Sequence, residues 1–267
     1  MKYAIDLAPL GGMADPRELV RLAVAAERAG WDGVSTWDVI GTAMSAPAAD
    51  PFVALAAIAA ATQRLTLITS VVVLPRRRPQ LVAQAAATLD QLSDGRFVLG
   101  IGAGGDPEDF TAFGEAFGPE RFAQLDRDAE AIDGWLRGQG SVAVGPRPAQ
   151  QPRPPIWVGG TKPAALRRAA RWDGWIGVAT TEDYGAMSLT PEDVAERIAV
   201  IGAERSRLGT DGQPFHVALF AHSDADEAPL VEAYGRAGVT WWLESLSPAR
   251  GATAELIARI EAGPPRR

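Results

Sequence analysis

Two kinds of segment alternate along the chain. Short apolar runs are followed by longer stretches in which apolar residues recur every three or four positions. An unbroken apolar run is typical of a strand buried on both faces, and the longer spacing is typical of a helix with one face against a core. The predicted strands span residues 2–7, 31–37, 65–74, 97–101, 156–158, 174–179, 215–221 and 239–243. The helices that follow them span residues 16–29, 51–61, 79–90, 121–136, 163–171, 191–208, 227–237 and 252–262.

This order of elements predicts an α/β fold. Strands that alternate with helices form a parallel sheet, and eight such units close into a (β/α)8 TIM barrel. The alternative is a doubly wound open sheet, but the G-x-G-x-G spacing at residues 100–104 follows the fourth strand and not an early strand–helix turn. The Gly/Pro/Gln-rich stretch that ends at Pro155 leads directly into another strand, so we expect it to be an insertion in a single domain over residues 1–267.

Composition and charge narrow the classes of function. The net charge is −7, from 33 acidic and 26 basic residues, which argues against nucleic acid or an anionic membrane as a partner. Cysteine is absent, which excludes disulfides and thiolate chemistry. The apolar part of the N-terminal stretch is too short for a signal peptide, and no run is long enough to span a bilayer. We therefore expect a cytoplasmic protein.

Glycines at two strand ends suggest binding of a ligand, because catalytic and binding groups of a barrel lie at the C-terminal ends of its strands. Gly159, Gly160 and Thr161 lead into a helix, so free N–H groups and the positive helix end would converge on an anion. An ordinary turn with Thr161 as the helix cap is the alternative. Gly102 and Gly104 permit close approach of a ligand to the backbone, or only form a tight turn.

Polar side chains at other strand ends are candidates for proton transfer. Asp38 belongs either to the site or to the cap of the next segment, and His222 is either a proton carrier or a solvated loop residue. Glu244 faces the pocket or pairs with Arg250, and we favour the pair. The basic run at residues 76–78 is a solvated helix start or holds a cofactor phosphate. No residue spacing predicts a metal site.

Three segments together resemble the luciferase-like family of flavin- or deazaflavin-dependent oxidoreductases. They are DPFVALAAIAAATQRLTLITSVVVLPRRRP at 50–79, LVAQAAATLDQLSDGRFVLGIGAGGDPEDFTAFG at 81–114 and PRPPIWVGGTKPAALRRAARWDGW at 152–175. The resemblance covers roughly the first two thirds of the chain. The family is a (β/α)8 barrel, in agreement with the strand count above.

The resemblance implies roles for single positions. Ser70 and Val71 fall where many members have a bulge with a non-prolyl cis peptide behind the cofactor ring. Asp38 matches an acid near the ring in the deazaflavin branch. The remaining positions implied to bind the cofactor are Gly102, Ala103 and Gly104 beside the ring, Gly159, Gly160 and Thr161 beside the ribityl chain and phosphate, and Ala179 and Thr180 at the next strand end.

The chain departs from the family in three places. Members often have histidine directly after the strand-two acid, where this chain has Val39. The sugar-phosphate dehydrogenase branch has a catalytic glutamate where this chain has Gly105. The insertion after the fourth strand, between Phe113 and Pro152, is shorter than the lid that members often build there.

We therefore predict an oxidoreductase or monooxygenase that uses F420, with FMN as the alternative cofactor, and acts on a small organic substrate by hydride transfer or oxygen activation. Asp38 and His222 are the predicted catalytic residues. The second hypothesis, motivated by Val39 and Gly105, is a barrel that binds flavin or F420 without catalysis. The Ala-rich helices at 51–61 and 79–90 predict a homodimer face.

Overall fold

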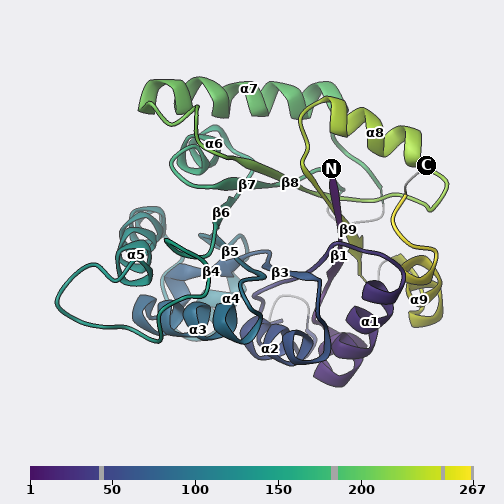
Figure 1. The fold of residues 1–267 in the computed structure, drawn as a ribbon, viewed down its shortest axis with the longest axis horizontal. Coiled ribbons are helices and arrows are strands. Elements are labelled where there is room, and N and C mark those ends of the chain that lie inside the picture. Colours follow the sequence, from purple (N-terminus) through teal and green to yellow (C-terminus); the bar gives the residue numbers. More distant parts are fainter. Residues whose placement is uncertain (42–44, 182–185, 248–249, 266–267) are drawn as a thin grey trace.

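The strands of the protein form one closed parallel sheet. The computed structural model describes all residues except 42–44, 182–185, 248–249 and 266–267. Among the described residues, nine strand segments follow each other in the order β3-β2-β1-β9-β8-β7-β6-β5-β4, and an additional pairing of β3 with β5 closes the sheet. Figure 1 shows helices around this sheet, with α7 and α8 on one side and α1, α2 and α3 on the opposite side. The predicted (β/α)8 barrel is confirmed.

The elements lie close to their predicted positions. The strands are β1 Lys2–Leu7, β2 Gly33–Thr36, β3 Thr66–Thr69, β4 Val72–Val73, β5 Phe97–Gly102, β6 Ile156–Gly159, β7 Gly174–Val178, β8 His216–Ala221 and β9 Trp241–Leu246. The α-helices are α1 Pro16–Arg28, α2 Pro51–Ala61, α3 Pro79–Leu92, α4 Glu108–Thr111, α5 Glu120–Leu136, α6 Pro163–Ala169, α7 Pro191–Leu208, α8 Ala228–Arg236 and α9 Thr253–Glu261. Two short 3-10 helices are η1 Gly11–Ala14 and η2 Leu74–Arg76. Of the described helices, none combines the length and apolar character needed to cross a bilayer.

The third predicted strand is divided into β3 and β4 at the peptide bond between Ser70 and Val71, which is cis. The Thr69 side chain replaces part of the backbone hydrogen bonding to β5 that this break interrupts. Its Oγ1 donates to the Gly100 carbonyl at 2.9 Å and accepts from the Gly100 N–H at 2.8 Å. The barrel wall therefore consists of eight strands, one of them in two pieces.

Local sequence signals account for the helix ends. Asp50 accepts hydrogen bonds from the first amides of α2, and Pro51 occupies its first turn. Thr190 and Asp193 form a capping box at the start of α7, and Gly209 ends this helix in the left-handed conformation, with φ of 69°. The ends of α2 and α7 thus follow from the conformational preferences and hydrogen bonds of these residues.

Candidate functional site

One end of the barrel is filled by aromatic side chains. Trp157 of β6 packs against His216 of β8, with ring centroids 5.4 Å apart, and against Trp241 of β9, at 5.9 Å. Neither β8 nor β9 is a neighbour of β6 in the sheet, so these rings meet inside the barrel. All three residues lie near the starts of their strands, so this plug closes the N-terminal end. The C-terminal ends of the strands form the opposite end, which we call the mouth.

Three of the segments predicted to bind a cofactor meet at the mouth. Val71 is partly exposed, and its side chain lies in front of two inward-facing glycines. A Cβ placed on Gly102 would lie 2.6 Å from Val71 Cγ2, and a Cβ placed on Gly159 would lie 2.9 Å from Val71 Cγ1. Such distances are too short for carbon atoms, so only glycine fits at either position while Val71 stays in place. We call Val71, Gly102 and Gly159 the ring seat.

The neighbouring positions predicted to bind the cofactor differ in the space around them. Gly104, at φ of 78°, has no room for a Cβ between Val73 and Phe110, and Ala103 is partly buried beside the core. Gly160 also lacks room, since a Cβ there would lie 2.6 Å from that of Ala165.

The predicted anion site after β6 lacks part of its donor set. The Gly160 N–H donates to the Ile176 carbonyl at 3.2 Å and is therefore not free for an anion. Thr161 is exposed and does not cap α6, because Lys162 occupies the N-cap position. At the end of β7, Ala179 and Thr180 are buried, and the Thr180 Oγ1 has no hydrogen-bond partner among the described residues.

Asp38 is buried at the mouth with both carboxylate oxygens engaged. Arg77 donates to Oδ2 at 2.8 Å and to Oδ1 at 2.7 Å, and the Val73 N–H donates to Oδ2 at 2.9 Å. Arg76 donates to the Asp38 carbonyl at 2.6 Å and pairs with Asp109 at 2.9 Å. Asp38 therefore ties the end of β2 to the segment after β4. The same pairs hold Arg76 and Arg77 in place, whereas Arg78 is exposed at the N-cap position of α3, so the expected solvated helix start describes only Arg78 of this basic run.

Asp6 of β1 lies inside the barrel among neutral donors. It accepts a hydrogen bond from Ser35, one from the Trp37 Nε1 at 2.5 Å, and one from the Ser70 hydroxyl at 2.9 Å. Burial raises the pKa of the Asp6 carboxyl to about 7, although these hydrogen bonds oppose the shift. Asp6 thus joins β1 to the end of β2 and to the first residue of the cis peptide.

Sequence reasoning passed over Asp6, although a signal was present. It is the one acid in an otherwise apolar stretch, YAIDL, of a strand predicted to be buried on both faces. A carboxyl group in such a place needs partners, because acids are almost never fully buried without them.

His222 follows β8 at the mouth. Its backbone N–H contacts the Met187 Sδ at 3.2 Å, and its buried Nδ1 has no hydrogen-bond partner among the described residues. The ring is partly buried, so the expected alternative of a solvated loop histidine does not describe it. The other histidine, His216, lies in the plug at the far end of the same strand, and burial lowers its pKa.

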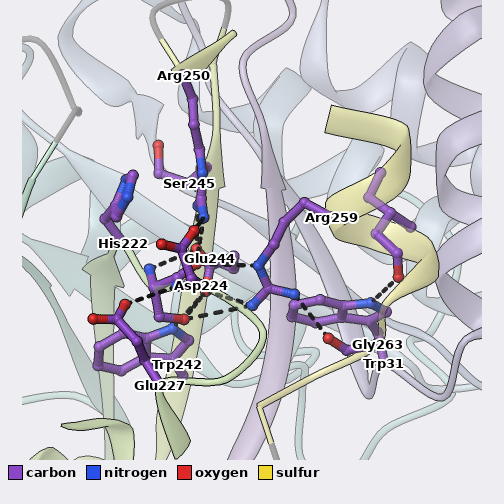
Figure 2. Close-up of polar contacts among 12 residues, drawn as sticks. Trp31, His222, Asp224, Glu227, Trp242, Glu244, Ser245, Arg250, Arg259 and Gly263 are labelled. Atoms are coloured by element: carbon purple, nitrogen blue, oxygen red, sulfur yellow. Dashed lines mark hydrogen bonds and ion pairs between the residues drawn. The ribbon is translucent and has the colours of Figure 1, made fainter. Parts of the chain in front are cut away.

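Glu244 is fully buried and, by alternation along β9 from the inward Trp241, points away from the barrel interior. Figure 2 shows its carboxylate among polar partners. It pairs with Arg250, as predicted, and with Arg259 at 3.1 Å. It also accepts hydrogen bonds from the Ser223 N–H at 2.8 Å and from the Trp242 Nε1 at 2.9 Å. Both arginines donate to the Ser223 carbonyl as well. We call Glu244, Arg250, Arg259 and Ser223 the outer clamp, which fastens the ends of β8 and β9 from outside.

Comparison with known proteins connects this geometry to a family. A family model described as luciferase-like monooxygenase matches residues 3–265. An uncharacterised protein of Mycobacterium tuberculosis is 34% identical over 191 residues, which cover 61% of this chain and 66% of that protein.

Two solved structures share the fold. An F420-dependent secondary alcohol dehydrogenase, in complex with an F420-acetone adduct, has a TM-score of 0.79 at 16% identity over 99% of this chain and 98% of the other. The oxygenating constituent of 3,6-diketocamphane monooxygenase from Pseudomonas putida, in complex with FMN, has a TM-score of 0.67 at 15% identity over 97% and 83%. At these identities the likeness concerns the fold.

Proposed function

The chain belongs to the luciferase-like monooxygenase family, and from this premise we propose that it is an oxidoreductase that binds a flavin-type cofactor at the mouth of the barrel. The observation that carries the proposal is the ring seat. Gly102 and Gly159 make room for the Val71 side chain, which stays partly exposed at the mouth, so a flat ring can lie against Val71.

The described residues fit such a cofactor in a second respect. The buried Thr180 hydroxyl has no partner among the described residues and lies just beyond the end of β7, the strand that pairs with β6, where it suits the polar chain of a flavin. When bound, the ring gives or accepts a hydride, and with FMN it also activates oxygen. The protein's own task is to hold the ring and to exclude water from it.

We assign proton transfer to His222, because its Nδ1 has no protein partner among the described residues. Asp38 is proposed as the second catalytic group. Its engagement by Arg77 suits a fixed negative charge beside the ring better than a mobile proton carrier. F420 is the preferred cofactor, because Asp38 and the Thr69–Ser70–Val71 stretch resemble the deazaflavin branch, and FMN is the alternative.

A titration of the purified protein with FMN and with F420, followed by fluorescence, tests the proposal. We expect one of the two to bind, and Gly102→Ala or Gly159→Ala to weaken binding at least about tenfold, because the new methyl group displaces Val71. Gly202→Ala on α7 is the matched control, since a Cβ there meets no atom within 4 Å. Binding of neither cofactor by the folded protein would contradict the proposal.

A second candidate, a barrel that binds the cofactor without catalysis, is favoured by the occupation of both Asp38 oxygens. The two candidates differ in the response of the loaded protein to His222→Gln and Asp38→Asn. In an enzyme, these variants lower the rate at which the reduced cofactor is oxidised in the presence of substrate or oxygen. In a binding protein, they leave the residual rate unchanged, with unfolding temperature as the check on folding.

A further inference from the structure

Three side chains at the ends of β8 and β9 have a buried polar atom that lacks a hydrogen-bond partner. These atoms are the His222 Nδ1, the Ser245 Oγ and the Ser247 Oγ, a finding that concerns the described part of the chain. Ser245 is 0% exposed and Ser247 is 4% exposed. A buried polar atom without a partner lowers stability, so a cluster of such atoms points to a ligand that completes their hydrogen bonds.

His222 and Ser245 share the inward face of the wall, and Ser247 is buried just beyond the end of β9. Trp241 points inward into the plug, and side chains alternate along a strand, so Ser245 of β9 points inward as well. His222 continues the inward row of β8, where Phe220 packs against Trp37 across the barrel at 6.0 Å.

The sheet register brings His222 and Ser245 together. Ala221 pairs with Glu244, so His222 and Ser245 are the next residues along the two neighbouring strands. Figure 2 shows the imidazole of His222 near Ser245, with no dashed line reaching the ring.

The outer clamp fixes the backbone of this group. Arg250 donates to the Ser245 carbonyl at 3.0 Å, and Glu244 and Ser223, which adjoin Ser245 and His222 in the chain, are held by the same network. The side chains of the inner face are thus placed by contacts on the outer face, while their own polar atoms stay unpaired. This is the arrangement of a preorganised binding site, in which the cost of ordering is met by the fold.

Charge selects the class of ligand. Arg250 and Arg259 are both engaged with Glu244 on the outer face and add no positive charge to the interior. On the inner face, Ser245 is the register partner of Asp6, a buried carboxyl. Among the described residues, the side chains that contact Asp6 are neutral donors, so a carboxylate or phosphate of a substrate would find no cation beside Asp6. A hydroxyl or carbonyl oxygen can form hydrogen bonds with the neutral polar groups there.

We propose that His222, Ser245 and Ser247 form a subsite for the hydroxyl or carbonyl oxygen of an uncharged organic substrate. The inference rests on the proposed function, because it places the substrate at the same mouth as the cofactor. The Thr180 hydroxyl, which also has no partner among the described residues, belongs to the proposed cofactor site. It therefore serves as a comparison for the two serines in the tests below.

The two histidines make a direct test available. In protein with labelled imidazole rings, titration with 2-butanol and 2-butanone should give a saturable shift of the His222 ring resonances in NMR. His216, in the plug at the other end of the same strand, should not respond. Butyrate, the anionic probe of similar size, should bind more weakly than either. An absent His222 response, or tighter binding of butyrate, would overturn the proposal.

Three variants separate the subsite from a structural role. Ser245→Ala and Ser247→Ala should each weaken 2-butanol binding about three- to tenfold, the effect of one neutral hydrogen bond. Neither should lower the unfolding temperature, because the hydroxyl removed has no partner to lose. Thr180→Val should change the affinity for FMN or F420 and leave the His222 response intact. An alanine variant that loses stability but keeps its 2-butanol affinity would show an internal hydrogen bond and overturn the proposal.

The cofactor titration keeps the two proposals distinguishable. If neither FMN nor F420 binds while His222 responds to 2-butanol, the subsite stands and the proposed function fails. If a cofactor binds while the His222 response is absent or survives both alanine substitutions, the proposed function stands and the subsite is overturned.

Discussion

Two fully buried carboxyl groups lie on opposite faces of the same barrel wall, and one has cationic partners while the other has neutral ones. Glu244 of β9 points outward and is paired with Arg250 and Arg259. Asp6 of β1, whose register partner is Ser245, points inward and has only neutral donors in the hydrogen bonds that the structure gives it. The first is a neutralised charge, and the second is a group whose pKa burial raises to about 7.

The difference between the two surroundings shows that Glu244 stabilises the fold, whereas Asp6 belongs to the candidate site. An ion pair under the helices fixes the loops after β8 and β9, and its charges have no access to a ligand. An acid without a cation inside the barrel takes its charge state from its surroundings, and its partners are Ser70 and Trp37, which belong to the mouth. The outward-facing Glu244 therefore stabilises the fold, and the inward-facing Asp6 makes the interior sensitive to ligand and to pH.

The largest expected effect on the free energy of unfolding comes from a substitution on the outer face of the wall. Among the described residues, Glu244→Gln removes the one negative charge paired with Arg259 and leaves Arg250 only the exposed Asp224 at 3.7 Å. We expect a loss of about 3–5 kcal/mol in the free energy of unfolding, measured with denaturant. Glu130→Gln, which breaks the exposed pair with Arg171, is the matched control and should cost less than about 0.5 kcal/mol. A small effect of Glu244→Gln would remove the contrast between the two faces.

The inner face provides a dependence on pH. Between pH 4 and pH 7 the folded protein keeps the proton on Asp6, while the unfolded chain has lost it. Stability from this group is therefore greatest at low pH and falls as pH rises to about 7, by at most about 1.4 kcal/mol per pH unit. Asp6→Asn lacks this slope, so the difference in unfolding free energy between wild type and variant should change across that window. A constant difference from pH 4 to pH 8 would contradict the raised pKa.

The smallest effect on the fold is expected at the outer surfaces of α2 and α3. Val53 is 63% exposed and Leu81 is 57% exposed, on the two helices predicted to form a homodimer face. The double variant Val53→Glu and Leu81→Glu should keep the unfolding temperature of an isolated subunit and lower the mass in solution from dimer to monomer, measured by light scattering. Val200→Glu on α7, at 42% exposure, is the control. A monomeric wild type at micromolar concentration would contradict the predicted dimer.

Much of the fold was readable because strand burial and helix caps are local properties of the chain. The apolar runs gave all eight strands, and residues such as Pro51, Thr190 and Gly209 lie at helix ends because of the backbone conformations and hydrogen bonds that their types favour. The split between β3 and β4 followed only from resemblance, since no local pattern in Thr69–Ser70–Val71 distinguishes a cis bond from a continuous strand.

The partners of the site residues were harder to read because they come from distant parts of the chain. Glu244 and Arg250 are six positions apart, and their pair was expected. Arg259, the third charge of the outer clamp, is on α9, and the Asp6 network joins β1 to residues 29, 31 and 64 positions away. Which of two nearby acids meets a cation depends on which side of the wall each one faces, and a one-residue change in strand register exchanges the two sides.

The aromatic plug of Trp157, His216 and Trp241 has a kinetic consequence. A barrel that is filled at one end has a single entrance, so two molecules that react inside it must enter and leave in sequence through the same opening. Whichever of them lies deeper must arrive first and depart last, and an excess of the other obstructs its exchange. The plug thus imposes an order of events on any two-substrate reaction at the mouth, through the topology of the wall alone.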